Sequence, residues 1–247
     1  MSISLILTLM LVGLLVGIAK TAIGGMGLVS AALLATILPA KESTGVLLIL
    51  LLVGDLFAIG VYKKHVEWKV LRSLLWPVIV GVLVGVFFLA KVSDLSLKYT
   101  IGWIVLALVA LFPISQRLQK KEIDLVVRYP RLLRNVLGSM SGFMSMIANS
   151  GGTPMTVYLL LRKNSVMNFL GNNAWFFFIL NASKVPFTLA LGILQFHSIH
   201  YIVPALPTVA IGALLGRRVI SKVNIELFQK ITLISAAAAG LNLILNN

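Results

Sequence analysis

Charged side chains interrupt long apolar stretches of the sequence at three positions. Lys20 follows 19 residues that carry no charged side chain, Asp55 lies inside a second apolar stretch, and Lys184 lies inside a third. A charge inside a bilayer is costly, and in membrane proteins such groups mark substrate or ion pathways. Two cations against one carboxylate favour an anionic ligand. These three residues are therefore the first candidates for a binding site, with Asp55 also a candidate proton carrier.

A glycine-rich segment follows Lys20. The stretch GLLVGIAKTAIGGMG over residues 13–27 begins as an apolar helix and is then interrupted by Gly24, Gly25 and Gly27. Irregular backbone at membrane depth needs cover from protein or a water-filled cavity, and glycine lets the backbone approach a ligand closely. A second break recurs in GSMSGFMSMIANSGGTP over residues 138–154. Two broken helical hairpins in one chain are typical of a transporter.

The second break also predicts where a helix begins. Thr153 is a suitable N-cap, and Pro154 suits the first helical position. The free N–H groups and the positive dipole end of such a helix attract anions. We expect no catalytic residue, no metal ligand and no cofactor. The predicted substrate-binding residues are Lys20, Gly24, Gly25, Gly27, Asn149, Ser150, Gly151, Gly152, Thr153, Asn173, Asn181 and Lys184, with Asn172 as a further donor.

Simpler interpretations of the charged residues stay open. Lys20 could extend its ammonium to the membrane surface, and Lys184 could be a structural partner of Asp55. Asp55 itself could carry a proton or only form an ion pair.

Aromatic and histidine side chains give weaker signals. The run from Trp175 to Phe178 is expected to face lipid or pack in the core, although it could form a wall for an aryl substrate. His197 and His200 have the spacing of metal ligands, but we expect no carboxylate near them and therefore no metal site. All three histidines lie at predicted loops, so a catalytic serine–histidine pair is not indicated.

The composition indicates an integral membrane protein. Of the 247 residues, 59% are hydrophobic and only 11% are charged, whereas soluble domains carry about 25% charged residues. The net charge of +14 does not indicate nucleic-acid binding, because the basic residues are spread between apolar spans. The absence of cysteine excludes disulfides and thiolate chemistry. The first residues lack a basic segment, and we interpret them as retained structure rather than a signal peptide.

The apolar segments predict an all-α fold of about eight membrane segments in two halves. Residues 1–116 form the first half, 117–131 a basic cytoplasmic linker with amphipathic character, and 132–247 the second half. Each half opens with a broken hairpin, over residues 3–39 and 132–161. The further predicted segments cover residues 42–61, 71–90 and 99–114, then 166–191, 199–215 and 227–245.

The two halves are similar in sequence at an offset of about 125 to 131 residues. The repeated features are a glycine pair in each hairpin, a polar residue in the next segment and a glycine pair in the third. Glycines four residues apart mark close helix packing. The matched positions are Gly13 and Gly17 with Gly138 and Gly142, Asp55 with Asn181, and Gly81 and Gly85 with Gly212 and Gly216. The order of these matches predicts a duplication.

The basic residues predict the topology. If each hairpin crosses the membrane an even number of times, 15 basic residues fall on one side and three, Lys41, Lys91 and Lys98, on the other. A single crossing per hairpin would divide them 10 to 8. The positive-inside rule favours the first arrangement, with both termini outside the cytoplasm and two inverted repeats. Whether the hairpins are re-entrant or span twice stays open, although residues 154–161 would reach only about 12 Å as a helix.

The chain resembles the TauE/SafE family, also called the 4-toluenesulfonate uptake permease family. The resemblance rests on the two glycine-rich hairpins, on NASK over residues 181–184 and on PTVAIGALLG over residues 207–216. It covers essentially the whole chain and implies a bacterial inner-membrane carrier of sulfur-containing or organic anions. By the same resemblance the hairpins and Lys184 would line the anion site. The second hairpin has Ala148, Asn149 and Ser150 before Gly151, so its tip departs from a pure glycine run.

Together these features predict a secondary transporter of a sulfonate or sulfite anion that works by alternating access. An anion channel, or a transporter of a carboxylate-type anion, is the alternative. A membrane-embedded enzyme would need a catalytic constellation that the sequence does not contain, and a passive scaffold would leave Lys184 unexplained. The expected partners are a small anion and membrane lipid, with no nucleic acid, and a homodimer stays open.

Overall fold

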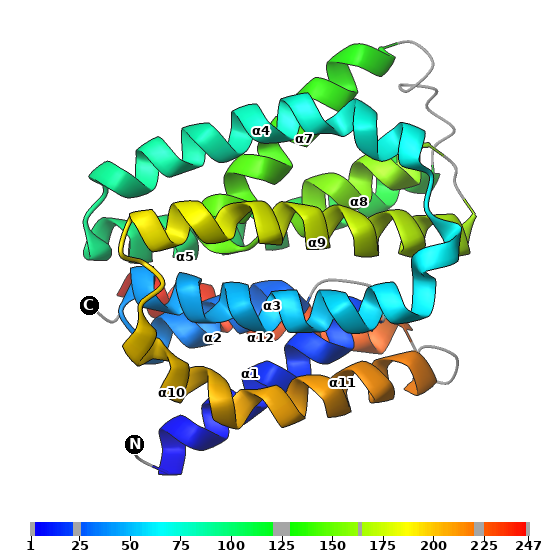
Figure 1. Cartoon of the computed structure of the whole chain (residues 1–247). Helices are drawn as coiled ribbons and strands as arrows, with labels where there is room; N and C mark the ends of the chain where they lie inside the picture. Colours follow the sequence, from blue (N-terminus) through cyan, green and yellow to red (C-terminus); the bar gives the residue numbers. More distant parts are fainter. Residues whose placement is uncertain (1–2, 22–25, 121–128, 163–164, 220–224, 246–247) are drawn as a thin grey trace.

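The computed structural model describes residues 3–21, 26–120, 129–162, 165–219 and 225–245 (Figure 1). Every regular element within these ranges is a helix. A helix pairs its backbone N–H and C=O groups internally, which is what a bilayer without water demands. The prediction of an all-α fold is therefore confirmed for this part of the chain.

The helices of the first half follow the predicted segments closely. The shortest is a single 3₁₀ turn, η1, which lies between two long helices where the sequence is rich in basic residues. The elements are α1 (Ile3–Thr21), α2 (Met26–Ile37), α3 (Ala40–Tyr62), η1 (Lys63–His65), α4 (Trp68–Lys91) and α5 (Asp94–Lys120).

The second half contains more short elements. Pro204 and Pro207 lie where the predicted segment 199–215 divides into short helices, since proline lacks the N–H that continues a helix. The elements are α7 (Pro130–Ala148), α8 (Gly152–Leu161), α9 (Val166–Ala190), η2 (Phe196–Ser198), α10 (Ile199–Ile202), η3 (Val203–Ala205), α11 (Leu206–Val219) and α12 (Ile225–Leu245).

Five stretches of helix in the described ranges are long and apolar enough to cross a membrane. They are Ile3–Thr21, Ala40–His65, Trp68–Lys91, Asp94–Leu111 and Phe196–Arg218. On the outside of α4, Trp76 is 74% exposed and Phe87 is 69% exposed. Such large apolar side chains on an outer helix face are suited to contact with lipid tails. The chain is a membrane protein.

Both hairpins have a short second helix. α2 has 12 residues and α8 has 10, or about 18 and 15 Å at 1.5 Å per residue. A hydrocarbon core of about 30 Å is thicker than either helix. α8 begins at Gly152, so Thr153 and Pro154 lie inside its first turn. The prediction of Thr153 as N-cap was therefore wrong by two residues, because the αL turn at Asn149 closes α7 early enough for the helix to restart at Gly152.

The predicted linker is only partly described. α5 continues to Lys120 and α7 begins at Pro130, so residues 117–120 belong to one helix and 130–131 to the next. The predicted amphipathic helix falls mainly on residues 121–128, which lie outside the described ranges.

Glycine pairs bring two pairs of helices into backbone contact, as the sequence predicted. α1 packs against α11, and α4 packs against α7. A Cβ atom at Gly17 would overlap Val209 O, and one at Gly212 would overlap Leu14 O. On the other pair, a Cβ at Gly81 would overlap Ser139 O.

Two further helix pairs lie between these outer pairs. A Cβ at Gly45, near the start of α3, would lie 2.7 Å from Ile193 O, just after α9 ends. A Cβ at Gly171, near the start of α9, would lie 2.5 Å from His65 O, just after α3 ends. α3 and α9 are therefore antiparallel neighbours at the centre of the molecule (Figure 1). α5 and α12 also pack together.

The glycine contacts generate a stability prediction. Gly81→Ala should lower the free energy of unfolding by about 1–3 kcal/mol, because the added methyl would press against the backbone of α7. Gly60→Ala is the matched control, since a Cβ at Gly60 meets no atom within 4 Å. Thermal unfolding of the detergent-solubilised variants measures both changes. Equal melting temperatures for the two variants would contradict close α4–α7 packing.

Candidate functional site

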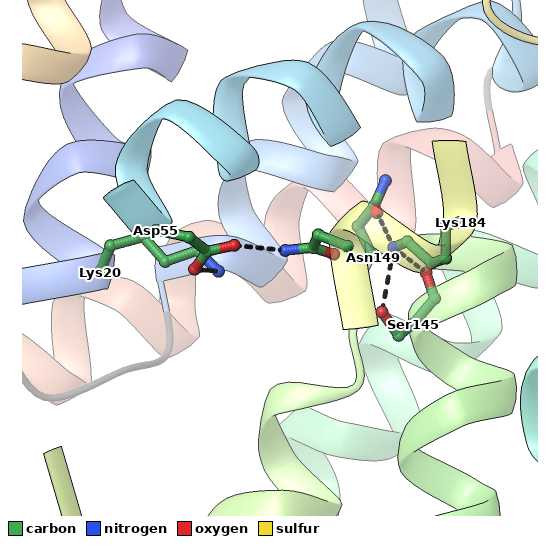
Figure 2. Close-up of polar contacts among 6 residues, drawn as sticks. Lys20, Asp55, Ser145, Asn149 and Lys184 are labelled. Carbon is green, nitrogen blue, oxygen red and sulfur yellow. Dashed lines mark hydrogen bonds and ion pairs between the residues drawn. The ribbon is translucent and has the colours of Figure 1, made fainter. Parts of the chain in front are cut away.

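Lys184 lies on the central helix α9 and is almost completely buried, with 1% of its surface exposed. Its Nζ donates to Ser145 O at 2.9 Å, to Ser145 Oγ at 3.0 Å and to Asn149 Oδ1 at 2.7 Å (Figure 2). An ammonium has three protons, and these contacts use all three. The group lies at the carbonyl end of α7, where the helix dipole favours a cation. The alternative that Lys184 is the partner of Asp55 is wrong.

Asn149 connects three helices at the tip of the second hairpin. It ends α7 in the left-handed conformation, with φ 51°, a conformation that asparagine adopts more readily than most residues. Its side chain accepts from Lys184 on α9, and its Nδ2 donates to Thr44 O on α3 at 3.0 Å. The tip is therefore attached to both central helices.

The remaining residues of this tip fold back on α7. Ser141 Oγ donates to Gly151 O at 2.7 Å, and Ser150 Oγ donates to Ala148 O at 2.9 Å. A Cβ at Gly151 would overlap Ser141 O, so glycine is required there by close approach. Gly152 starts α8, and Thr153 is half-buried in its first turn.

Lys20 lies in the last turn of α1 and is paired inside the protein. Its Nζ is 2.6 Å from Asp55 Oδ1, and its side chain is only 12% exposed. The same ammonium lies 4.7 Å from the centre of the Phe177 ring, a cation–π contact. The alternative that Lys20 extends to the membrane surface is wrong, because Asp55 offers it a counter-charge inside the protein.

Asp55 is fully buried and is contacted on both oxygens. Oδ1 faces Lys20, and Oδ2 accepts from Asn181 Nδ2 at 2.7 Å. Asp55 and Asn181 are the two positions that the sequence comparison of the halves placed in register, and the fold brings them into direct contact. Figure 2 shows Lys20 and Asp55 on one side and Lys184, Ser145 and Asn149 on the other.

Two site residues were missed by sequence reasoning. Ser145 binds Lys184, and the offset that places Gly138 on Gly13 would have placed Ser145 on Lys20. Phe177 was considered only as part of an aromatic run. Phe176 and Phe177 are both buried, which agrees with the expectation that the run faces lipid or packs in the core.

Several predicted residues lie elsewhere or outside the described ranges. Asn172 Oδ1 accepts from Glu67 N at 2.6 Å and so holds the connection between η1 and α4. Gly24 and Gly25 lie outside the described residues. Gly27 is in the first turn of α2, and a Cβ there would meet no atom within 4 Å. Asn173 is half-buried on α9, one turn before Phe177.

The expectation of no carboxylate near the histidine pair was wrong. His197 Nε2 lies 2.9 Å from Glu42 Oε1, and Ser198 Oγ donates to the same oxygen at 2.9 Å. His200 contacts the backbone oxygen of His197. Within the described part of the chain, no three His, Asp or Glu side chains converge as metal ligands do.

Comparison with known proteins decides the family. The family model for "Sulfite exporter TauE/SafE" matches residues 9–243, a range that includes Lys20, Asp55 and Lys184. The chain belongs to the TauE/SafE family. Neither the curated proteins nor the solved structures contain a match to it. TauE/SafE proteins are membrane transporters, which agrees with the apolar helices described above.

The contacts of Lys184 generate a prediction about this transporter. Lys184→Met keeps most of the side-chain volume but removes the ammonium, so Ser145 Oγ and Asn149 Oδ1 lose this donor, whereas Ser145 O still accepts from Asn149 N at 3.0 Å. Buried acceptors left without a donor cost about 1–3 kcal/mol, and the melting temperature should fall accordingly. Lys91→Met, at an exposed lysine, is the control. An unchanged melting temperature for Lys184→Met would contradict its role in holding the second hairpin tip.

Proposed function

We propose that this TauE/SafE protein is a secondary transporter that carries a small sulfonate- or sulfite-type anion across the bacterial inner membrane. The observation that carries the proposal is the buried pair of Lys20 and Asp55. At the end of a broken hairpin, an ammonium group already holds an anionic oxygen at 2.6 Å. An oxygen of a substrate anion can take the same place.

Lys20 is the better candidate for direct contact with the anion, and Lys184 for positioning. The Lys20 side chain is 12% exposed, whereas Lys184 is 1% exposed. The Lys184 ammonium also donates all three of its protons to hydrogen bonds within the protein. In this proposal Lys184 holds the second tip in place. The predicted residues of that tip, from Asn149 to Thr153, then form the opposite wall of the site. Asn173 and Asn181 line the site from α9.

Proton coupling follows from the same exchange. When an anion takes the place of Asp55 at Lys20, the carboxylate loses its counter-charge while it is still fully buried. A buried charge without a partner is costly and neutralises instead. We expect Asp55 to take up a proton in that step, while Asn181 keeps contact with its other oxygen. The anion and the proton would therefore bind together.

The helix contacts support two inverted repeats related by a two-fold axis in the membrane plane. We count each hairpin as one segment of its half. The first helix of each hairpin packs against the third segment of the other half, as α1 with α11 and α7 with α4. The second segments, α3 and α9, pack together and are antiparallel, as the glycine contacts indicate. The fourth segments, α5 and α12, also pack together. The proposed halves are 1–116 and 132–247, and the axis passes near the contact of Asp55 with Asn181.

This symmetry suits alternating access around a central site. The ends of α3, α8 and α11 and the starts of α4, α7 and α9 lie on one side of the molecule in Figure 1. Basic residues next to these ends include Lys63, Lys64, Arg131 and Arg162. The positive-inside rule places this side in the cytoplasm and both termini in the periplasm.

A carboxylate-type anion is the second candidate substrate. The group that Lys20 holds in this structure is itself a carboxylate, that of Asp55. The choice between the two classes depends on the third oxygen of a sulfonate, for which the tip residues would have to supply donors.

Binding of anions tests the proposal. Sulfite, sulfate, taurine, an aryl sulfonate and a matched carboxylate are each added to the purified protein, and thermal unfolding is followed. A ligand that binds only the folded state stabilises it by about 2.7 kcal/mol at 100 times its Kd. We expect one of these anions to raise the melting temperature, and the effect to be lost in Lys20→Gln but kept in Lys91→Gln. Stabilisation by none of the anions, or an equal effect in Lys20→Gln, would contradict an anion site at Lys20.

Proton coupling has a separate test in proteoliposomes. In the wild-type protein, anion uptake should rise as pH falls, because protonated Asp55 no longer competes for Lys20. Asp55→Asn removes the competing charge, so anion binding should become at least tenfold tighter and uptake should lose its pH dependence. An Asp55→Asn variant with wild-type pH dependence would contradict the role of Asp55.

A further inference from the structure

The Phe177 ring lies where both hairpins meet the central helix α9. Lys20 Nζ, at the end of α1, lies over the face of this ring, 4.7 Å from the ring centroid. Its Cζ atom would lie 3.9 Å from a Cβ at Gly152, the first residue of α8. One side chain thus touches the cation of the first hairpin and comes close to the start of the short helix of the second. Phe177 is also buried, with 9% of its surface exposed.

Phe177 shares one face of α9 with two asparagines. Residues four apart on a helix lie above one another, so Asn173, Phe177 and Asn181 form a polar–aromatic–polar row. Asn181 holds Asp55 through its amide. Asn173 Oδ1 is buried and has no hydrogen-bond partner among the described residues. Buried polar atoms are nearly always paired, so this oxygen, on the residue one helical turn before Phe177, is a candidate acceptor for a donor group of a ligand.

We propose that Phe177 is the residue that determines which anions this transporter accepts, and that it selects organic anions with an apolar substituent over bare oxyanions. The inference rests on the proposed function, in which the anionic head takes the place of Asp55 at Lys20. The rest of the substrate then lies against the ring that covers Lys20. An apolar substituent gains contact with the ring, and aromatic groups pack well against it. A bare oxyanion loses hydration there without such a gain.

The neighbouring ring of Phe176 provides a matched control. Phe176 is also buried and packs edge-on against Phe177, with ring centroids 5.1 Å apart. It precedes Phe177 by one residue and therefore lies about 100° away around the helix, at 3.6 residues per turn. A purely structural role for the aromatic pair predicts similar effects of substitution at both positions.

The test compares two sulfonates that share one head group. Calorimetric titration of the purified full-length protein gives the Kd of benzenesulfonate and of methanesulfonate, with sulfite as the bare oxyanion. We expect the wild-type protein to bind benzenesulfonate at least tenfold more tightly than methanesulfonate. Phe177→Leu should reduce this ratio to near one, while the Kd of sulfite changes less than threefold. Phe176→Leu should keep the wild-type ratio.

Different failures identify different errors. Equal affinity of the wild-type protein for the two sulfonates overturns the inference about Phe177 and leaves the anion site standing, and this measurement needs no variant. A wild-type ratio in Phe177→Leu, or in Phe177→Met if the leucine variant does not fold, overturns it as well. Equal loss of selectivity in Phe176→Leu shows a structural role only. Absence of binding by every anion overturns the proposed function and this inference with it.

Discussion

A lysine ammonium inside a bilayer needs a counter-charge or a complete set of acceptors, and the centre of this structure is arranged around two such groups. Lys20 is satisfied by Asp55 and by the face of Phe177, whereas Lys184 is satisfied by Ser145 and Asn149. The two ways of satisfying a buried ammonium differ in kind. In the proposed function the single ion pair of Lys20 is exchanged for one with the substrate anion, whereas three hydrogen bonds at the end of a helix hold Lys184 in place.

The broken hairpins allow both buried lysines to be satisfied. A carbonyl oxygen has two lone pairs, and Ser145 O near the end of α7 accepts both from Asn149 N at 3.0 Å and from Lys184 Nζ at 2.9 Å. Asn149 can turn the chain there because asparagine tolerates the left-handed conformation, and its side chain reaches α3 and α9 together. The end of α7 therefore explains why a buried lysine on α9 is tolerated. The glycine contacts of α1 with α11 and of α4 with α7 hold the hairpins close enough to the central helices for these bonds to form.

Much of the fold could be predicted because the bilayer imposes simple local rules. Apolar length gave most helices within a few residues, glycine spacing marked the positions of close helix packing but not which helices meet there, and the glycine-rich breaks gave the hairpins. The candidate site was predicted less completely. Lys20, Asp55, Asn181 and Lys184 were found because polar residues in apolar stretches are conspicuous, but Ser145 and Phe177 resemble ordinary helix residues. Thr153 was predicted as the N-cap of the short helix, but α8 begins one residue earlier, at Gly152.

The sequence by itself determined the membrane class, the two broken hairpins, the family and the polar residues that must be buried. Each of these depends on composition or on residue spacing along one segment, and the apolar environment of the bilayer constrains both directly. Only the tertiary structure decided that Lys20 rather than Lys184 pairs with Asp55, that Lys184 closes the end of α7, and that Glu42 reaches His197. Helical periodicity fixes which residues share a face, but the partner of that face depends on how separate helices pack. A buried charge takes whichever counter-group that packing places within hydrogen-bond distance.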